Sequence, residues 1–154
     1  MKHLSFAAFS FLLTTLPALA GGSSTVGPGS PAAIFCLAEG GTLQTVNSPR
    51  GQSGLCTFGE RGSISDWTFF REKNGRGEQA VEAFFRPLPM RVGPLGNPSA
   101  TFCESQNGKI EIVKTREGSE LGLCTFADNS SIEAWTLLRG PTHAANAALV
   151  NVLR

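Results

Sequence analysis

The sequence carries little charge and no excess of either sign. It has 13 basic and 12 acidic residues among 154, which gives a formal net charge of +1. A nucleic-acid-binding surface needs an excess of Lys and Arg to displace counterions from phosphates, so this balance argues against a nucleic-acid partner. Balanced charge also leaves no basis for electrostatic targeting to a membrane surface.

The residue patterns that carry common chemistry are missing as well. Only one histidine, His143, lies beyond the first 20 residues, and no acid is near it in sequence, so a Ser-His-Asp or Cys-His site would depend on it. The cysteines form no C-x-x-C pair and no close Cys/His pairs of the kind that bind zinc. The turn-like stretch 74–77 is no phosphate loop. We therefore expect no catalytic residue, no cofactor and no metal ion.

Long apolar runs are also missing, since a membrane-spanning helix takes about 20 apolar residues. The chain instead starts like a secretory signal peptide over residues 1–20. It has a basic residue at Lys2, an apolar run over residues 4–16, and small residues at Ala18 and Ala20. We predict cleavage after Ala20 and a periplasmic or secreted location.

An internal repeat is the most informative feature that the sequence does contain. The stretch GLCTF at 54–58 recurs at 122–126, and the surrounding residues align at an offset of 67 before one inserted residue and 68 after it. The repeat indicates a tandem duplication of a module of about 42 residues. We define module 1 as residues 30–72, module 2 as residues 97–140, and the connector between them as residues 73–96.

The segments outside the modules have simpler predictions. Residues 21–29 read as a flexible N-terminus, and residues 141–154 as a C-terminal helical tail. Within the connector, residues 78–85 suit two helical turns, and prolines after them end the helix. The connector also carries apolar residues, which predict that it packs on a module; these are Val81, Phe84, Phe85, Leu88 and Met90.

Each module is predicted to be a small α+β unit of helix, β-hairpin and helix. Ser30 and Asn97 suit the N-cap of the first helix, and each is followed by a proline at the first helical position. Ile110 and Ile112 alternate with charged residues, which is typical of a strand. The GLCTF stretch would then be the returning strand.

The second helix of the module is predicted from positions shared by the two copies. In module 1 these are Ile64, Trp67, Thr68 and Arg71, at the spacing i, i+3, i+4, i+7 of one helical stripe. The simplest interpretation places this stripe in the core. The alternative makes Trp67, or Trp135 in module 2, a platform for a ligand.

Arg71 and its equivalent Arg139 have two interpretations. An arginine near a helix C-terminus favours the helix dipole, and it can form a structural salt bridge. The functional interpretation is recognition of a carboxylate on a partner. The candidate partner-binding residues are therefore Arg71, Arg139, Trp67 and Trp135.

Carboxylates at equivalent positions raise the question of acid–base chemistry. Glu60 aligns with Asp128, and both lie at a turn before a helix, where an acid favours the helix N-terminus. Asp66 has no acidic equivalent in module 2. A glycosidase-like pair of carboxylates is the alternative interpretation.

Four cysteines, an even number in a chain predicted to be exported, indicate disulfides. A module of about 42 residues buries too little apolar area to be comfortably stable alone, and closing a loop of about 20 residues contributes roughly 3 kcal/mol. We prefer pairing within modules, Cys36–Cys56 and Cys103–Cys124. Exchange between modules, such as Cys36–Cys124 with Cys56–Cys103, stays open as the alternative.

Module 2 reads NPSATFC from residue 97, GLCTF from 122, DNSSIEAW from 128 and LLRG from 137. Both modules, and this one more closely, resemble a family of small bacterial envelope domains of unknown function, loosely labelled as haemolysins. The family's pattern has two further cysteines, both missing here. The third family cysteine falls on Ile64 in module 1 and on Ile132 in module 2, and the fourth falls near Thr142 in module 2. Because these two are lost together, the resemblance implies that they pair with each other, which supports pairing within modules. It implies no catalytic residues.

These features predict a secreted or periplasmic, non-enzymatic protein that binds another envelope protein or a surface polymer in an inhibitor-like manner. The reason is a rigid, disulfide-stapled scaffold without a catalytic constellation. A small envelope hydrolase that uses carboxylates is one alternative, and a structural envelope protein or membrane effector is another. Pore formers need apolar spans of about 20 residues or serial alternating strands of about 10, so we expect no stable membrane insertion.

Overall fold

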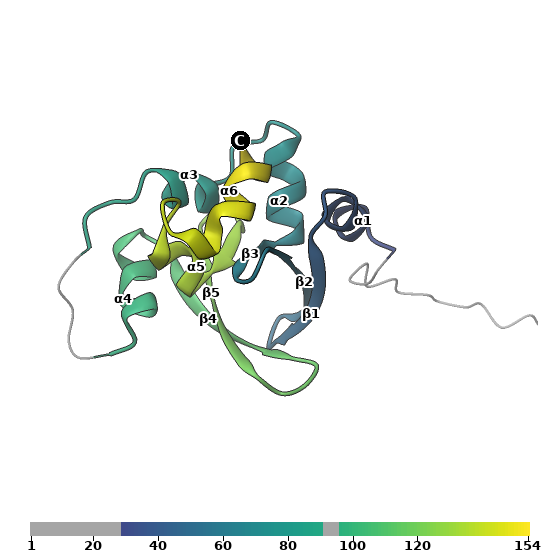
Figure 1. Cartoon of the computed structure of the whole chain (residues 1–154). Coiled ribbons are helices and arrows are strands. Elements are labelled where there is room, and N and C mark those ends of the chain that lie inside the picture. Colours follow the sequence, from purple (N-terminus) through teal and green to yellow (C-terminus); the bar gives the residue numbers. More distant parts are fainter. Residues whose placement is uncertain (1–28, 91–95) are drawn as a thin grey trace, which may run out of the picture.

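The computed structural model describes residues 29–90 and 96–154 (Figure 1). The predicted signal peptide and nearly all of the predicted flexible N-terminus lie outside the described residues. Module 1 and the connector contain α1 (Pro31–Ala38), β1 (Thr42–Ser48), β2 (Gly51–Phe58), β3 (Gly62–Ser65), α2 (Asp66–Lys73) and α3 (Gln79–Phe85). Module 2 and the tail contain α4 (Pro98–Ser105), β4 (Lys109–Thr115), β5 (Glu120–Thr125), β6 (Ser131–Glu133), α5 (Ala134–Arg139), η1 (Ala144–Asn146) and α6 (Ala147–Leu153).

The mixed α+β class is confirmed, but the helix–hairpin–helix description of each module is incomplete. A third strand, β3 or β6, follows each hairpin, and Ile64 and Ile132 belong to these strands rather than to the helices. The helical stripe predicted from Ile64 to Arg71 therefore runs across a strand–helix boundary. Strands of four and three residues are too short to show the alternation that identifies a strand.

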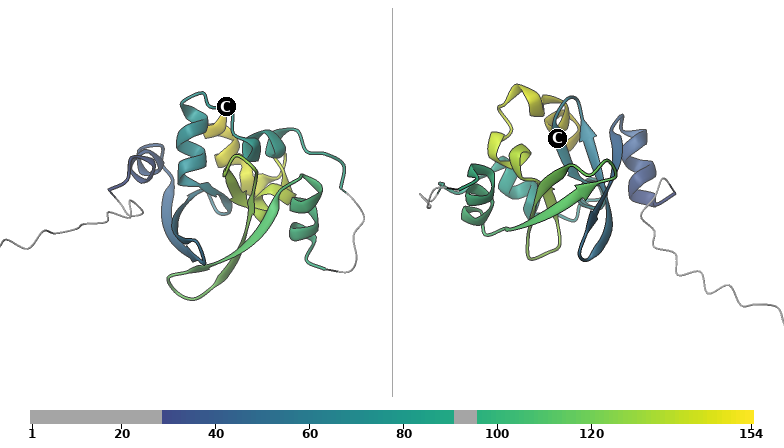
Figure 2. Two further views of the ribbon diagram at one scale, coloured as in Figure 1. Left: turned by 180° about the vertical axis from the view of Figure 1, so that it is seen from behind. Right: turned by 90° about the horizontal axis from the view of Figure 1, so that it is seen from below.

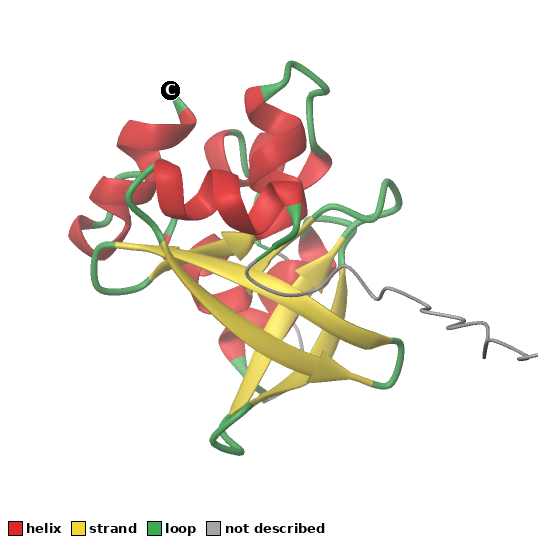
Figure 3. Cartoon of the chain, turned by 90° about the vertical axis from the view of Figure 1, so that its right-hand side faces the viewer, coloured by secondary structure: helices red, strands yellow, loops and turns green. Residues whose placement is uncertain are grey.

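The six strands close into one barrel that both modules share, in the order β1-β2-β3-β6-β5-β4 (Figure 3). All neighbouring strands are antiparallel, and the modules meet at two seams, β3 with β6 and β1 with β4. At one seam Ile64 pairs with Ile132, and at the other Asn47 pairs with Lys114. Both pairs join equivalent positions of the repeat, so a pseudo-twofold axis passes through both seams.

The same pseudo-symmetry relates the helices. The first helices of the two modules, α1 and α4, lie on opposite sides of the barrel (Figure 2). Ser30 Oγ accepts a hydrogen bond from the Ala33 amide at 3.0 Å, and Asn97 Oδ1 accepts one from the Ser99 amide at 3.1 Å. Both predicted N-caps are therefore confirmed.

Two apolar clusters lie on the two faces of the barrel wall. The smaller cluster joins residues of β1, β2, β4 and β5, which only the barrel interior can bring together; these are Val46, Leu55, Val113 and Leu123. The larger cluster lies between the outer face of the strands and the helices, and it includes Phe58, Ile64, Ile132 and the fully buried Phe69. The interior cluster plugs the middle of the barrel.

Disulfides join Cys36 to Cys56 and Cys103 to Cys124, so pairing within modules is confirmed and exchange between modules is excluded. Each bridge ties the first helix to the second strand. The repeated glycine after the first helix is required for space, because a Cβ at Gly41 would lie 2.6 Å from Cys56 Sγ. Two disulfides indicate an oxidising, extracytoplasmic environment.

The helix that follows each module packs against the other module. The connector helix α3 packs against β6 of module 2, and the tail helix α6 packs against β3 of module 1. Asp128 Oδ2 and Ser130 Oγ of module 2 accept hydrogen bonds from the Gln79 and Ala80 amides of α3, at 2.8 and 2.9 Å. The prediction that the connector packs on a module is confirmed for α3, whose Val81 and Phe84 are buried, but it is wrong for Leu88 and Met90, which are 47% and 48% exposed. The structural repeat extends to α3 and α6, beyond the repeat visible in the sequence.

A pair of buried threonines adds hydrogen bonds between the modules. Thr68 Oγ1 accepts a hydrogen bond from the Ser131 amide at 2.9 Å, and Thr136 Oγ1 accepts one from the Ser63 amide at 3.1 Å. Thr68 and Thr136 occupy equivalent positions and are both fully buried. Each module therefore supplies a hydrogen-bond acceptor for a buried backbone amide of the other module.

Candidate functional site

The barrel has two mouths, one on each side of the interior plug, and the pseudo-twofold axis relates them. The wide mouth encloses ≈ 730 Å³, and its lining includes Gln44, Thr57, Ser63, Glu133, Trp135 and Arg139. The narrow mouth encloses ≈ 290 Å³ and is lined by the equivalents Glu111, Thr125, Ser131, Ser65, Trp67 and Arg71. Barrel mouths are common places for ligand sites.

Each mouth places the Trp and Arg of one module against strands of the other. Trp135 and Arg139 of module 2 face β1, β2 and β3, whereas Trp67 and Arg71 of module 1 face β4, β5 and β6. All four residues that the sequence suggested for partner binding therefore line mouths, one pair at each. The sequence did not indicate that the two modules would build these sites together.

Ion pairs narrow one of the mouths. Arg50, in the turn between β1 and β2, reaches across the seam and bonds both carboxylate oxygens of Glu111 on β4. Hydrogen bonding to Arg50 lowers the pKa of Glu111. The equivalents of Arg50 and Glu111 are Glu117 and Gln44, which cannot form this ion pair, and of these two Gln44 lines the wide mouth.

Arg71 is held in a second, bidentate ion pair. Its Nε and Nη2 donate to Glu78 Oε1 and Oε2 at 2.8 and 2.7 Å, and the Glu78 side chain is buried. Hydrogen bonding to Glu78 raises the pKa of Arg71 above its ordinary value. The salt-bridge interpretation is therefore confirmed for Arg71.

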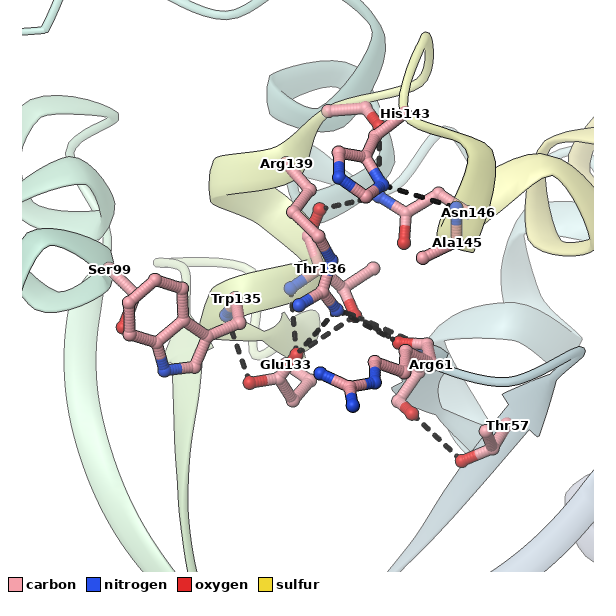
Figure 4. A network of polar contacts seen from close by, with 12 residues as sticks. Thr57, Arg61, Ser99, Glu133, Trp135, Thr136, Arg139, His143, Ala145 and Asn146 are labelled. Atoms are coloured by element: carbon pink, nitrogen blue, oxygen red, sulfur yellow. Dashed lines mark hydrogen bonds and ion pairs between the residues drawn. The ribbon is translucent and has the colours of Figure 1, made fainter.

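Glu133 organises the wide mouth by capping α5 (Figure 4). Its Oε1 accepts a hydrogen bond from the Trp135 amide at 2.9 Å, and its Oε2 accepts one from the Thr136 amide at 2.7 Å. Arg139 Nη2 donates to the Arg61 carbonyl oxygen at 3.1 Å and lies 3.7 Å from Glu133 Oε2. The carboxylate of Glu133 is thus engaged mainly by the helix N-terminus.

The two tryptophans differ in exposure. Trp135 keeps 44% of its surface exposed at the wide mouth. Trp67 is half-buried and packs edge-on against Phe70, with ring centroids 5.8 Å apart. The core interpretation is therefore wrong for Trp135, because α5 turns this side chain towards the mouth rather than into the cluster beneath the helices.

Of the other polar residues considered from the sequence, Glu60 is exposed and lines the wide mouth, whereas Asp128, Asp66 and His143 lie elsewhere. Asp128 caps α3, and although burial alone would raise its pKa, hydrogen bonds from Ser130 and Gln79 lower it overall. Asp66 is 2% exposed, and burial raises its pKa. His143 Nδ1 accepts a hydrogen bond from the Ala145 amide at 3.1 Å, which starts η1.

Within residues 29–90 and 96–154, no group of three or more His, Cys, Asp or Glu side chains is placed to hold a metal ion. Over the same residues, no helix combines the length and the apolar composition that crossing a membrane requires.

Residues 27–73 and 94–141 each match the family described as "Domain of unknown function (DUF333)". The chain belongs to this family. The resemblance inferred from the repeated motifs is thereby confirmed, including the two tandem copies. The family's description assigns no activity.

Several relatives of this family member are uncharacterised proteins. The protein YoaF of Escherichia coli K12 is 31% identical over 80 residues, which is 46% of this chain and 95% of the relative. The YoaF proteins of Escherichia coli O6:H1 and Shigella flexneri match to the same extent. No solved structure matches the chain.

Sequence reasoning missed several residues that line the mouths of this family member, namely Gln44, Arg50, Arg61, Glu111 and Glu133. Most of them are places where the two copies differ. Gln44 stands opposite Glu111, and Ser65 opposite Glu133. A comparison of such differences would have indicated that the two halves carry different side chains at equivalent positions of the mouths.

Proposed function

We propose that this protein is a non-enzymatic, periplasmic or secreted binding protein that holds a partner at the wide mouth. The observation that carries the proposal is the difference between two mouths of common origin. The narrow mouth is lined by Arg50 and Glu111 in an ion pair, whereas the wide mouth has more than twice the volume and an exposed tryptophan. Exposed aromatic residues in a concave site are typical anchors for a partner.

The scaffold supports this proposal. The helices α3 and α6 and the hydrogen bonds of Thr68 and Thr136 hold the two modules together, so the wide mouth is formed before a partner arrives. A preformed site loses little conformational entropy on binding. We propose as partner another envelope protein or a surface polymer, because the two disulfides indicate an oxidising environment.

Capture from an envelope extract of the producing organism tests the proposal. Immobilised wild-type protein is compared with Trp135→Ala and with the matched variant Trp67→Ala, which changes the equivalent residue of the narrow mouth. We expect wild type and Trp67→Ala to retain the same partner and Trp135→Ala to lose it. Retention of the partner by Trp135→Ala would refute the proposal.

Two rival functions have their own readouts in the same purified protein. A hydrolytic activity that a single carboxylate substitution abolishes would establish the hydrolase alternative in place of binding. Leakage of liposomes on addition of the protein would establish the membrane-effector alternative. We expect neither activity.

A further inference from the structure

Arg139 lacks the carboxylate partner that its equivalent has. Arg71 is paired with Glu78, the N-cap of α3, whereas the residue at the N-cap of α6 is Asn146. The Asn146 side-chain amide donates to the Thr136 and Gly140 carbonyl oxygens at 2.9 and 2.8 Å. Its Oδ1 and the Nε of Arg139 are both buried without a hydrogen-bond partner among the described residues. Before the tail helix, module 2 therefore has an amide where module 1 has a carboxylate, and the ion-pair partner of Arg139 is instead Glu133, which aligns with Ser65.

Two carboxylates, Glu60 and Glu133, and one further arginine, Arg61, share the wide mouth with Arg139. Glu133 lies 3.7 Å from Arg139, but it already accepts hydrogen bonds from the first turn of α5. Arg61 also lines the wide mouth, its side chain is exposed, and it forms no ion pair among the described residues. Glu60 is exposed and forms no ion pair among the described residues, so a carboxylate from outside would meet Arg61 and Arg139 beside one exposed carboxylate.

The wall beside these arginines is apolar. Trp135 and the half-buried Leu121 both line the wide mouth. The hydroxyls of Thr57 and Ser63 bond to each other at 2.8 Å, which leaves fewer free groups for the many hydroxyls of a sugar. This arrangement favours a carboxylate attached to an apolar group.

An unpaired strand edge leads to the same mouth. In β1 only Val46 and Asn47 pair with β4, so residues 42–45 pair with β2 alone. A hollow of ≈ 790 Å³ runs along residues 42–45 and shares Gln44 and Thr57 with the wide mouth. Extended peptides bind such edges through backbone hydrogen bonds, which a sugar cannot copy.

We propose that the wide mouth binds the C-terminal end of a peptide chain. The terminal carboxylate is held by Arg139 and Arg61, the last side chain is apolar and packs on Trp135 and Leu121, and the preceding residues extend along the free edge of β1. This proposal rests on the proposed function, since it names the part of the partner that the wide mouth recognises.

Titration with defined peptides tests the proposal on the full exported chain. The probes are two pools of N-acetylated Ala-Ala-Xaa peptides, one with a free C-terminal carboxylate and one with a C-terminal amide. Charge-assisted hydrogen bonds contribute more than neutral ones, so we expect the acids with apolar Xaa to bind at least about tenfold more tightly than the amides. Equal binding of acids and amides, or no binding of either pool, would overturn the proposal.

Variants locate the carboxylate site without relying on one substitution. Arg139→Gln and the exposed Arg61→Gln should each remove much of the preference for acids over amides. Arg50→Gln, at the narrow mouth, should leave that preference unchanged. Full retention of the acid preference in both Arg139→Gln and Arg61→Gln would overturn the assignment.

Glucuronate separates a peptide from a sugar acid. If glucuronate displaces the peptide acids at equal concentration, the wide mouth recognises a sugar acid and the peptide proposal is wrong. A failed peptide titration together with loss of capture in Trp135→Ala would refute this proposal and leave the proposed function standing.

Discussion

Replacing Thr136 with Val tests whether the two modules depend on each other for stability. The Thr136 hydroxyl accepts a hydrogen bond from the Ser63 amide across the modules and lies 2.9 Å from the Arg61 carbonyl oxygen. Valine has nearly the same shape but no hydroxyl, so the change leaves a buried amide of the other module without an acceptor. An unsatisfied buried group costs about 1–3 kcal/mol, and the loss of a donor to Arg61 adds to this cost.

We therefore expect Thr136→Val to lower the free energy of unfolding by about 2–3 kcal/mol, measured by urea denaturation. The matched variant Thr68→Val loses only the bond from the Ser131 amide, so we expect about 1–2 kcal/mol. Hydrogen exchange should speed up at Ser63 in the first variant and at Ser131 in the second. A loss below about 0.5 kcal/mol in both variants, within the usual range for neutral substitutions, would refute the interlocked arrangement.

Three further predictions concern other parts of the molecule. Because burial raises the pKa of Asp66, the contribution of this carboxyl to stability should be lost as pH rises from the ordinary Asp pKa through the raised value. Asp66→Asn should lack this contribution, so urea denaturation should show the stability of wild type falling relative to that of the variant over this pH range. Since the pKa of Glu111 is lowered, the contribution of the Arg50–Glu111 ion pair to the free energy of unfolding should be lost as pH falls through that lowered pKa. Replacing Arg50 with Gln should lower the free energy of unfolding by under about 1 kcal/mol at neutral pH, because the Arg50 side chain is 63% exposed. Replacing Cys103 and Cys124 with Ser should lower the free energy of unfolding by about 2–5 kcal/mol. A non-reducing peptide map of the wild-type protein should show only bridges within modules.

Local signals in the sequence were sufficient for the first half of each module. Ser30 and Asn97, each followed by proline, predicted the first helices correctly, because N-caps and proline act within a few residues. The spacing of the repeat and the loss of two family cysteines predicted the disulfides. Two short strands, β3 and β6, escaped because each carries one isoleucine among small or polar residues.

Contacts between the modules were beyond the reach of local patterns. The barrel depends on pairing Ile64 with Ile132 across a wide sequence separation, and no periodicity reports such a contact. The helices α3 and α6 share too little sequence for the repeat to extend to them. Asn146 and Glu78 occupy the same place before these helices, but their difference becomes informative only once Arg71 and Arg139 are seen beside them.

For the candidate site, the sequence identified residue types but not their arrangement. The repeated Trp and Arg were recognised as candidates, yet which pair is exposed depends on neighbours from the other module. Arg50 and Glu111 fill one mouth, while Gln44 leaves the other open. Two equivalent pairs could therefore not be ranked before the barrel was known.

The two tryptophans provide the most direct test that the wide mouth is the binding site. The chain has only Trp67 and Trp135, so Trp67→Phe reports on the wide mouth alone and Trp135→Phe on the narrow mouth alone. The partner retained by immobilised wild-type protein is titrated into both variants while tryptophan fluorescence is recorded. We predict a saturable change in the Trp67→Phe variant and none in Trp135→Phe. A change confined to Trp135→Phe, which reports on the narrow mouth, would contradict this account.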